Sequence, residues 1–108
     1  MPHTSEIILC TCPDNATAEK IAYQLLENNL AACINIVPGI TSIYKWQGKI
    51  ESAQEHLLLI KSNEADYPKL ETQIKALHPY ELPEIITISI ANGLSEYLNW
   101  INSCHSLK

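Results

Sequence analysis

Apolar and polar positions along this chain change period several times, and each period predicts a helix or a strand. The apolar run 7-IILC-10, rich in β-branched residues, predicts a buried strand that ends near Cys12 and Pro13. Asp14 and Asn15 are favourable helix N-cap residues. Apolar side chains then recur at helical spacing, at Ala18, Ile21, Ala22, Leu25 and Leu26. A first helix is therefore expected here, ending at the asparagines of 28-NN-29.

A long β-rich segment, 31-AACINIVPGITSIYKW-46, follows this helix. Pro38-Gly39 interrupts the segment and predicts a bulge or a bend. Gln47-Gly48 places a glycine where a tight hairpin turn needs a positive φ, and the return strand passes through 57-LLLIKS-62. Both arms exceed the usual strand length of about six residues. The hairpin is therefore expected to protrude and to pair with something beyond its own sheet.

The second half of the chain predicts two more helices and a strand. A helix is expected to start near Asp66 and Pro68, because proline is tolerated in a first turn, and to end before Pro79. Its apolar stripe comprises Tyr67, Leu70, Ile74 and Leu77. The alternating segment 86-ITISI-90 predicts a half-buried strand, which Gly93 ends. A last short helix is expected to turn Leu94, Leu98 and Ile101 inward.

The order β-α-β-β-α-β plus a terminal helix predicts an α+β fold. It is the ferredoxin-like, or split βαβ, pattern with an extended hairpin between its second and third strands. At 108 residues, 1–108 is expected to form one domain. Right-handed crossovers would place both main helices on one sheet face. The other face, rich in isoleucine, then lacks a cover, so we expect an oligomer whose closed symmetry seals this face and the hairpin edges.

Charge and composition narrow the possible partners and the compartment. The formal net charge of −5 argues against nucleic-acid binding, because an acidic surface repels phosphate. No apolar run reaches the roughly 18 residues that a membrane span needs. The N-terminal 1-MPHTSE-6 lacks the basic and apolar regions of a signal peptide. We therefore expect a cytoplasmic protein whose cysteines are free thiols rather than a disulfide framework: Cys10, Cys12, Cys33 and Cys104.

The chain carries no enzyme signature. It has no G-x-S-x-G, no H-E-x-x-H and no glycine loop for phosphate. A cysteine and a histidine could supply a nucleophile and a base, but the spacing indicates neither an oxyanion hole nor an orienting acid. We expect a protein that is not an enzyme and has no organic cofactor.

Cys10 and Cys12 form the first candidate for metal chemistry, because residues two apart on a strand face the same side. Thiolates favour soft ions such as Cu(I), and imidazole suits Cu(II) or Zn(II). Two small residues packed in a core are the alternative. His78 ends a predicted helix, where the dipole favours an imidazolium, so capping alone could explain it. The other histidines are expected at the surface: His3, His56 and His105.

Polar residues around the prolines form a second candidate. Tyr80 and Glu84 flank the constrained segment from Pro79 to Pro83, and loops held on a rigid scaffold often carry binding groups. Lys61 ends an apolar strand, so it is expected either to reach solvent or to pair with a carboxylate, Glu84 being one candidate.

Tyr44 and Trp46 alternate with Lys45 along the predicted hairpin. Aromatic residues are common anchors of protein interfaces. Contact between subunits is therefore favoured for them over stacking on a ligand.

The chain resembles the CutA divalent-cation-tolerance proteins along nearly its whole length. The resemblance is carried by 9-LCTCPDNATA-18, 30-LAACINIVPGITSIYKWQGKI-50, 57-LLLIKS-62, 78-HPYELPEI-85 and 97-YLNWI-101. It implies a homotrimer of ferredoxin-like subunits that binds a divalent metal, copper or zinc. It also implies clefts between subunits, to which we assign Tyr44, Trp46, Lys61, Tyr80, Glu84 and Tyr97.

The resemblance implies that Cys10 and His78 bind copper. This chain adds Cys12, and it has Leu77 where some relatives carry a further histidine. Metal binding and metal tolerance by a homotrimer form the leading hypothesis, with Cys10, Cys12 and His78 as ligands. The alternative is a trimeric signalling or scaffold module that binds a small ligand in the cleft between subunits, with incidental metal binding.

Overall fold

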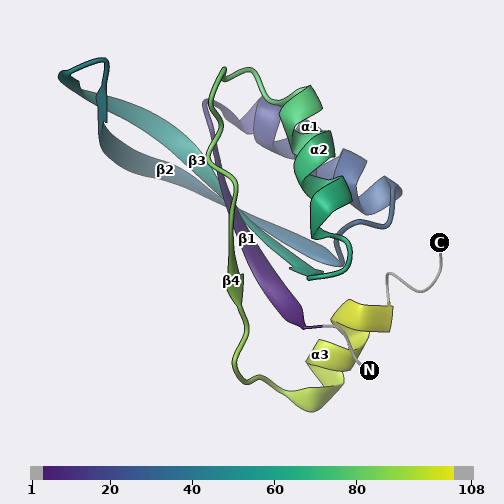
Figure 1. The fold of residues 1–108 in the computed structure, drawn as a ribbon. Helices are drawn as coiled ribbons and strands as arrows, with labels where there is room; N and C mark the ends of the chain where they lie inside the picture. Colours follow the sequence, from purple (N-terminus) through teal and green to yellow (C-terminus); the bar gives the residue numbers. More distant parts are fainter. Residues whose placement is uncertain (1–3, 104–108) are drawn as a thin grey trace.

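The computed structural model describes residues 4–103, so Cys104, His3 and His105 lie outside the described residues. The elements in chain order are β1 (Ser5–Cys12), α1 (Asn15–Glu27), β2 (Cys33–Trp46), β3 (Lys49–Asn63), α2 (Tyr67–Leu77), β4 (Ile86–Ser89) and α3 (Ser95–Ser103). All strand pairs are antiparallel, and the four strands follow the order β2-β3-β1-β4 (Figure 1). The predicted α+β class and the predicted order of elements are confirmed.

The core lies between one face of the sheet and the helices α1 and α2, which lie side by side (Figure 1). Alternate residues of β1 and β3 point to this helix-covered face, since side chains of a strand alternate in direction. The fully buried members are Ile8, Cys10, Cys12, Leu58 and Ile60 from the strands and Ala18, Ile21, Leu25, Leu70 and Ile74 from the helices. The predicted apolar stripes of both helices thus face the sheet, except that Leu26 near the end of α1 is 38% exposed.

Local signals define where the helices begin and end. The Asp14 carboxylate accepts a hydrogen bond of 2.8 Å from the Thr17 amide and so caps α1. At the end of α2, His78 has extended backbone angles, and its amide still donates to the Ile74 carbonyl. Pro79 follows, and the residue before a proline avoids helical angles. The histidine is thereby fixed at the last turn of α2.

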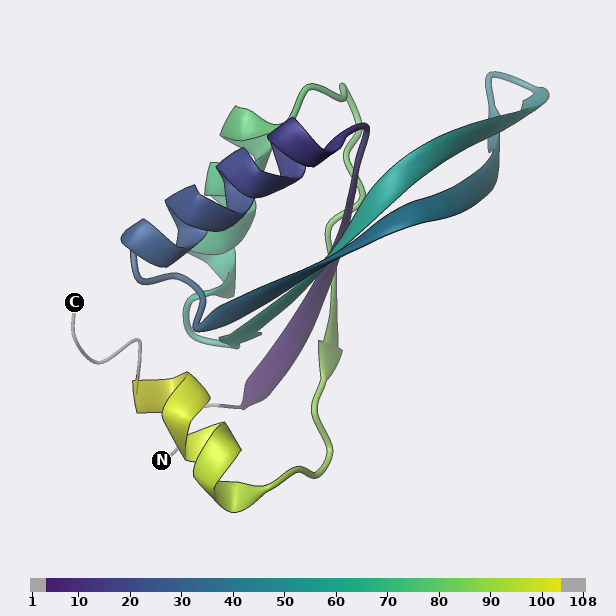
Figure 2. The ribbon, with the colours of Figure 1, turned by 180° about the vertical axis from the view of Figure 1, so that it is seen from behind.

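The β2–β3 hairpin extends well beyond the rest of the sheet (Figure 2). Its arms have 14 and 15 residues, and the register shifts between Val37 and Ile40, where Gly39 has a φ of 71°. At the tip, Gln47 and Gly48 both have positive φ, 51° and 81°, as a type I′ turn requires. The predicted bulge, turn and protruding arms are confirmed.

Two expectations about burial are wrong within the subunit. All four residues of β4 are exposed, although a half-buried strand was expected, because β4 is an edge strand that pairs only with β1. Leu94 is 69% exposed because it precedes α3, whereas Ile101 is fully buried and Leu98 partly buried. No helix among residues 4–103 is long and apolar enough to cross a membrane.

Candidate metal centre and adjoining cleft

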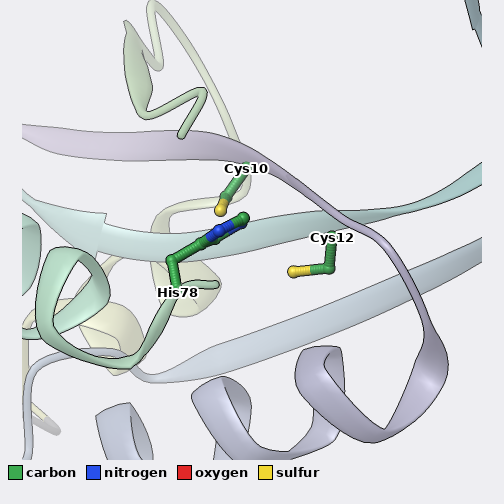
Figure 3. Close-up of side chains that lie close together, drawn as sticks. All are labelled: Cys10, Cys12 and His78. Carbon is green, nitrogen blue, oxygen red and sulfur yellow. The ribbon is translucent and has the colours of Figure 1, made fainter. Parts of the chain in front are cut away.

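Three side chains predicted from the sequence converge between β1 and α2. Cys10 and Cys12 project from the end of β1 toward His78 at the end of α2 (Figure 3). Their sulfur and ring-nitrogen atoms all lie within 4.8 Å of one another. Both cysteines are fully buried, and His78 is 8% exposed. Residues from distant parts of the chain therefore form one enclosed cluster, here called the thiol–imidazole cluster.

Hydrogen bonds fix the orientation of the His78 ring. Its Nδ1 accepts from the Tyr80 amide at 3.1 Å, and its Nε2 lies 2.7 Å from the Thr11 carbonyl. An acceptor Nδ1 requires the proton to sit on Nε2, which donates to Thr11. Metal-binding histidines commonly donate their other ring N–H to a backbone carbonyl in this way. Nδ1 therefore carries the lone pair that an ion could use, and an ion bound there would replace the hydrogen bond from the Tyr80 amide.

The pKa values of the two thiols are shifted in opposite directions. A hydrogen bond between them raises the pKa of Cys10, and burial and the charges of Glu84 and Glu55 raise it further. The same hydrogen bond lowers the pKa of Cys12, because the Cys10 thiol stabilises a neighbouring thiolate. Cys12 is therefore the first of the pair to become a thiolate, the form that binds metals.

The donor set fits a soft or borderline metal ion. Around a tetrahedral centre with bonds of about 2.3 Å, ligand atoms lie about 3.8 Å apart, so a spread of 4.8 Å closes with shifts below about 1 Å. Two sulfurs and one imidazole suit copper or zinc. Within residues 4–103, no other group of three or more potential ligand residues is gathered this closely. Core packing alone also buries cysteines, and the two hydrogen bonds of His78 hold its ring beside the thiols without an ion.

His56 was expected at the surface, and that expectation is wrong. The residue is partly buried and lies directly opposite Cys12 in the β1–β3 register. Its Nδ1 is buried without a hydrogen-bond partner among the described residues. The alternation of side chains along the strand could have predicted this burial. His56 points to the same face as Leu58 and Ile60, which face the helices.

A cleft of about 940 Å³ lies on the other side of β1, between the hairpin and the segment that follows α2. Its lining comprises Thr11, Ser42, Ile43, Tyr44, Trp46, Glu51, Glu55, Pro79, Tyr80, Glu81, Leu82, Pro83 and Glu84. Four predicted cleft residues, Tyr44, Trp46, Tyr80 and Glu84, thus meet within one subunit.

Lys61 and Tyr97 do not line this cleft. The Lys61 ammonium donates a hydrogen bond to Asn35 Oδ1 on the neighbouring strand, so within the subunit its partner is Asn35 and not the suggested Glu84. Tyr97 lies on α3, with its ring 5.5 Å from that of Trp100. A place for these two residues in a cleft between subunits stays a prediction.

Glu55 is a cleft residue that the sequence reasoning missed. It is only 6% exposed, and its Oε2 accepts the Tyr80 hydroxyl at 2.6 Å. Burial and this hydrogen bond raise the pKa of Tyr80. Glu55 points to the same face of the sheet as Leu57 and Leu59, because residues two apart on a strand face the same side. The sequence therefore indicated the face on which Glu55 lies, but not that Tyr80 is its partner.

Comparison with known proteins gives one consistent family. The model of the family described as CutA1 divalent ion tolerance protein matches residues 6–104. The Divalent-cation tolerance protein CutA of Thermus thermophilus is 52% identical over 96 residues, covering 89% of this chain and 93% of the relative.

Solved structures agree with the sequence match. The crystal structure of CutA from Xylella fastidiosa is similar with a TM-score of 0.91 and 48% identity, over 94% of this chain and 97% of that one. The crystal structure of CutA1 from Oryza sativa has a TM-score of 0.92 and 37% identity, over 95% of this chain and 94% of that one.

Proposed function

Because this chain belongs to the CutA1 divalent ion tolerance protein family, we propose that it binds a divalent metal ion, copper or zinc, as part of tolerance to such ions. The thiol–imidazole cluster of Cys10, Cys12 and His78 is the proposed binding site. The convergence of its ligand atoms within 4.8 Å in a buried position carries this proposal. The protein acts by binding rather than by catalysis, and in the cytoplasm, where thiols stay reduced.

Each ligand has a distinct part in ion uptake. Cys12 supplies the first thiolate, because its pKa is lowered by the Cys10 thiol. Cys10 would bind as the second thiolate once it has lost the proton that its hydrogen bond to Cys12 and its burial favour in the ion-free protein. His78 would bind through Nδ1, which accepts from the Tyr80 amide in the ion-free protein, and its Nε2–H would still donate to the Thr11 carbonyl. Ion binding therefore releases protons and becomes stronger as the pH rises.

The proposed assembly is a homotrimer of single-domain ferredoxin-like subunits. Three features of the subunit support it: the exposed apolar residues of β4, the protruding hairpin, and the unpaired outer edges of β2 and β4. Contact with another subunit is favourable for exposed apolar area and for unpaired strand edges. A closed symmetric assembly provides this contact in every copy.

Calorimetric titration with Cu(II) and with Zn(II) tests the proposed site. Cys10→Ser, Cys12→Ser and His78→Ala are each expected to weaken binding by at least about tenfold, since each removes one of few ligands. Cys33→Ser is the matched control, because Cys33 is a free thiol on β2 outside the cluster. Equal affinities for parent and cluster variants would show that the ion binds elsewhere.

A further inference from the structure

The cleft between the hairpin and the 79–84 segment has the size of a ligand site. Its volume of about 940 Å³ lies near the upper end of the range of small-molecule pockets. One wall is the distal hairpin with Tyr44 and Trp46, and the facing wall is the proline-bounded segment with Tyr80 and Glu84. Proline restricts the backbone of that segment, so this wall is partly organised before any ligand enters.

The cleft is lined by negative charge alone. Its four charged residues are Glu51, Glu55, Glu81 and Glu84, and its lining contains no lysine, arginine or histidine. The whole chain carries a net charge of −5, which adds to the local field. A cleft lined by charge of one sign attracts ligands of the opposite sign.

Glu55 offers a specific point of attachment within the cleft. The side chain is more than nine-tenths buried, with 6% exposure, and Tyr80 satisfies only its Oε2. Oε1 accepts no hydrogen bond among residues 4–103, and it is not one of the buried polar atoms without a partner, so it stays accessible from the cleft. A carboxylate oxygen that is open to a cleft, on a side chain that is otherwise largely buried, can accept a charge-assisted hydrogen bond from a cationic donor.

Aromatic rings and the spread of the carboxylates distinguish between classes of cation. Tyr44, Trp46 and Tyr80 line the cleft, and the faces of aromatic rings attract organic cations at short range. The carboxylates do not gather closely enough to form a metal-ligand group with one another; among residues 4–103 only the thiol–imidazole cluster does so. We propose that this cleft binds a small organic cation, a protonated alkylamine or guanidine, on Glu55 with its alkyl part against the aromatic rings.

Binding of 1,4-diaminobutane, measured by calorimetry on chelator-treated protein, tests the proposal, with 1,4-butanediol as the neutral match. The diamine is expected to bind, and the diol is not. Glu55→Gln keeps an acceptor for Tyr80 but loses the charge, and it should weaken diamine binding by at least about tenfold. Glu84→Gln should weaken it as well, and higher ionic strength should do the same.

Two control variants separate the cleft from other causes. Glu64→Gln removes an exposed carboxylate outside the cleft lining and should leave diamine affinity unchanged. Cys12→Ser impairs the proposed metal site but should also leave diamine affinity unchanged, so the two sites can fail separately. Equal loss in Glu64→Gln and Glu55→Gln would reduce the effect to net charge and overturn the proposal.

Three further outcomes would overturn the proposal. Equal binding of the diol would remove the role of charge. Displacement of the diamine by an equal concentration of Mg²⁺ would make the cleft a metal site. Diamine binding that appears only in Lys45→Ala or Lys49→Ala would mean that a hairpin lysine of a second copy occupies the cleft.

Discussion

At the scale of single residues, Tyr80 joins the two regions of interest. Its amide donates to His78 Nδ1 in the thiol–imidazole cluster, and its hydroxyl donates to Glu55 in the cleft. The rings of His78 and Tyr80 are tilted against each other with centroids 4.7 Å apart. The start of the segment after α2 therefore contributes to two sites, because His78 belongs to the thiol–imidazole cluster and Tyr80 lines the cleft.

The Tyr67 hydroxyl forms a partly buried hydrogen bond whose contribution to stability depends on pH. Its hydroxyl donates to Glu71 at 2.7 Å, and burial and this carboxylate raise the pKa of Tyr67 from 10.0 to about 12. The folded state therefore keeps a proton that the unfolded state loses above pH 10. This contribution to stability is complete below pH 10 and is lost as the pH rises to about 12.

Tyr67→Phe should lower the free energy of unfolding at pH 7 by about 1 kcal/mol, because it removes one partly buried hydrogen bond. It should also flatten the fall in stability between pH 10 and about 12. Denaturant unfolding of parent and variant across this range measures both effects. An identical alkaline slope in the two proteins would contradict the assignment to Tyr67.

The alternation of side chains along a strand explains which features of single residues could be predicted from the sequence. Strand period alone placed Cys10 and Cys12 on one face, whereas only the resemblance to the CutA proteins linked His78 to them. In the structure they meet because the end of α2 lies beside the end of β1. The same alternation does not specify partners across strands. Lys61 bonds to Asn35 rather than Glu84 because Asn35 lies on the adjacent strand, on the same face of the sheet.

At the scale of elements, the caps and turns followed the sequence closely. Asp14, the Gln47-Gly48 turn and the interruption at Gly39 each depend on local backbone geometry, which a few neighbouring residues determine. The burial of β4 and Leu94 was wrong because it depends on what packs over them. Neither α1 nor α2 covers the edge strand, and a four-residue pattern contains no information about that.

The cap of α1 gives a test at acidic pH. The bond from the Thr17 amide lowers the pKa of Asp14 below its usual 3.8. The folded state thus favours the carboxylate, so this contribution to stability is present above pH 3.8 and is lost as the pH falls through the lowered pKa.

Asp14→Asn should retain the cap at pH 7 but lose part of the acid dependence, since asparagine caps helices about as well and does not titrate. Asp14→Ala should lower the midpoint temperature of unfolding both at pH 7 and at pH 3. Thermal unfolding of parent and variants at these two pH values measures the difference. A destabilisation by Asp14→Asn equal to that by Asp14→Ala at pH 7 would show that charge, rather than the hydrogen bond, supports the helix.

At the scale of the whole molecule, the uncovered surfaces predict self-association. Ile88 on β4 is 52% exposed in the subunit and lies opposite Ile7 on β1, on the sheet face away from α1 and α2. Ile88→Lys should weaken the proposed homotrimer, because a buried unpaired charge is costly. Sedimentation velocity at several concentrations measures the effect.

Tyr23→Lys is the matched control, because Tyr23 is an exposed apolar residue on α1, away from that sheet face. It should leave the sedimentation coefficient of the parent unchanged. A parent that sediments as a monomer, or an Ile88→Lys variant that assembles as the parent does, would exclude this mode of association. The sequence indicated the uncovered face, but the partner that covers it is a property of several copies rather than of one chain's pattern.

The central position of β1 has a consequence for the time at which the thiols are accessible. β1 pairs only with β3 and β4, both far along the chain, so a nascent chain made from its N-terminus has no partner for β1 until residues 49–63 have emerged from the ribosome. Cys10 and Cys12, fully buried in the folded subunit, are open to solutes during that interval. Synthesis thus provides a period in which ions and oxidants reach both sulfurs freely, and folding ends it.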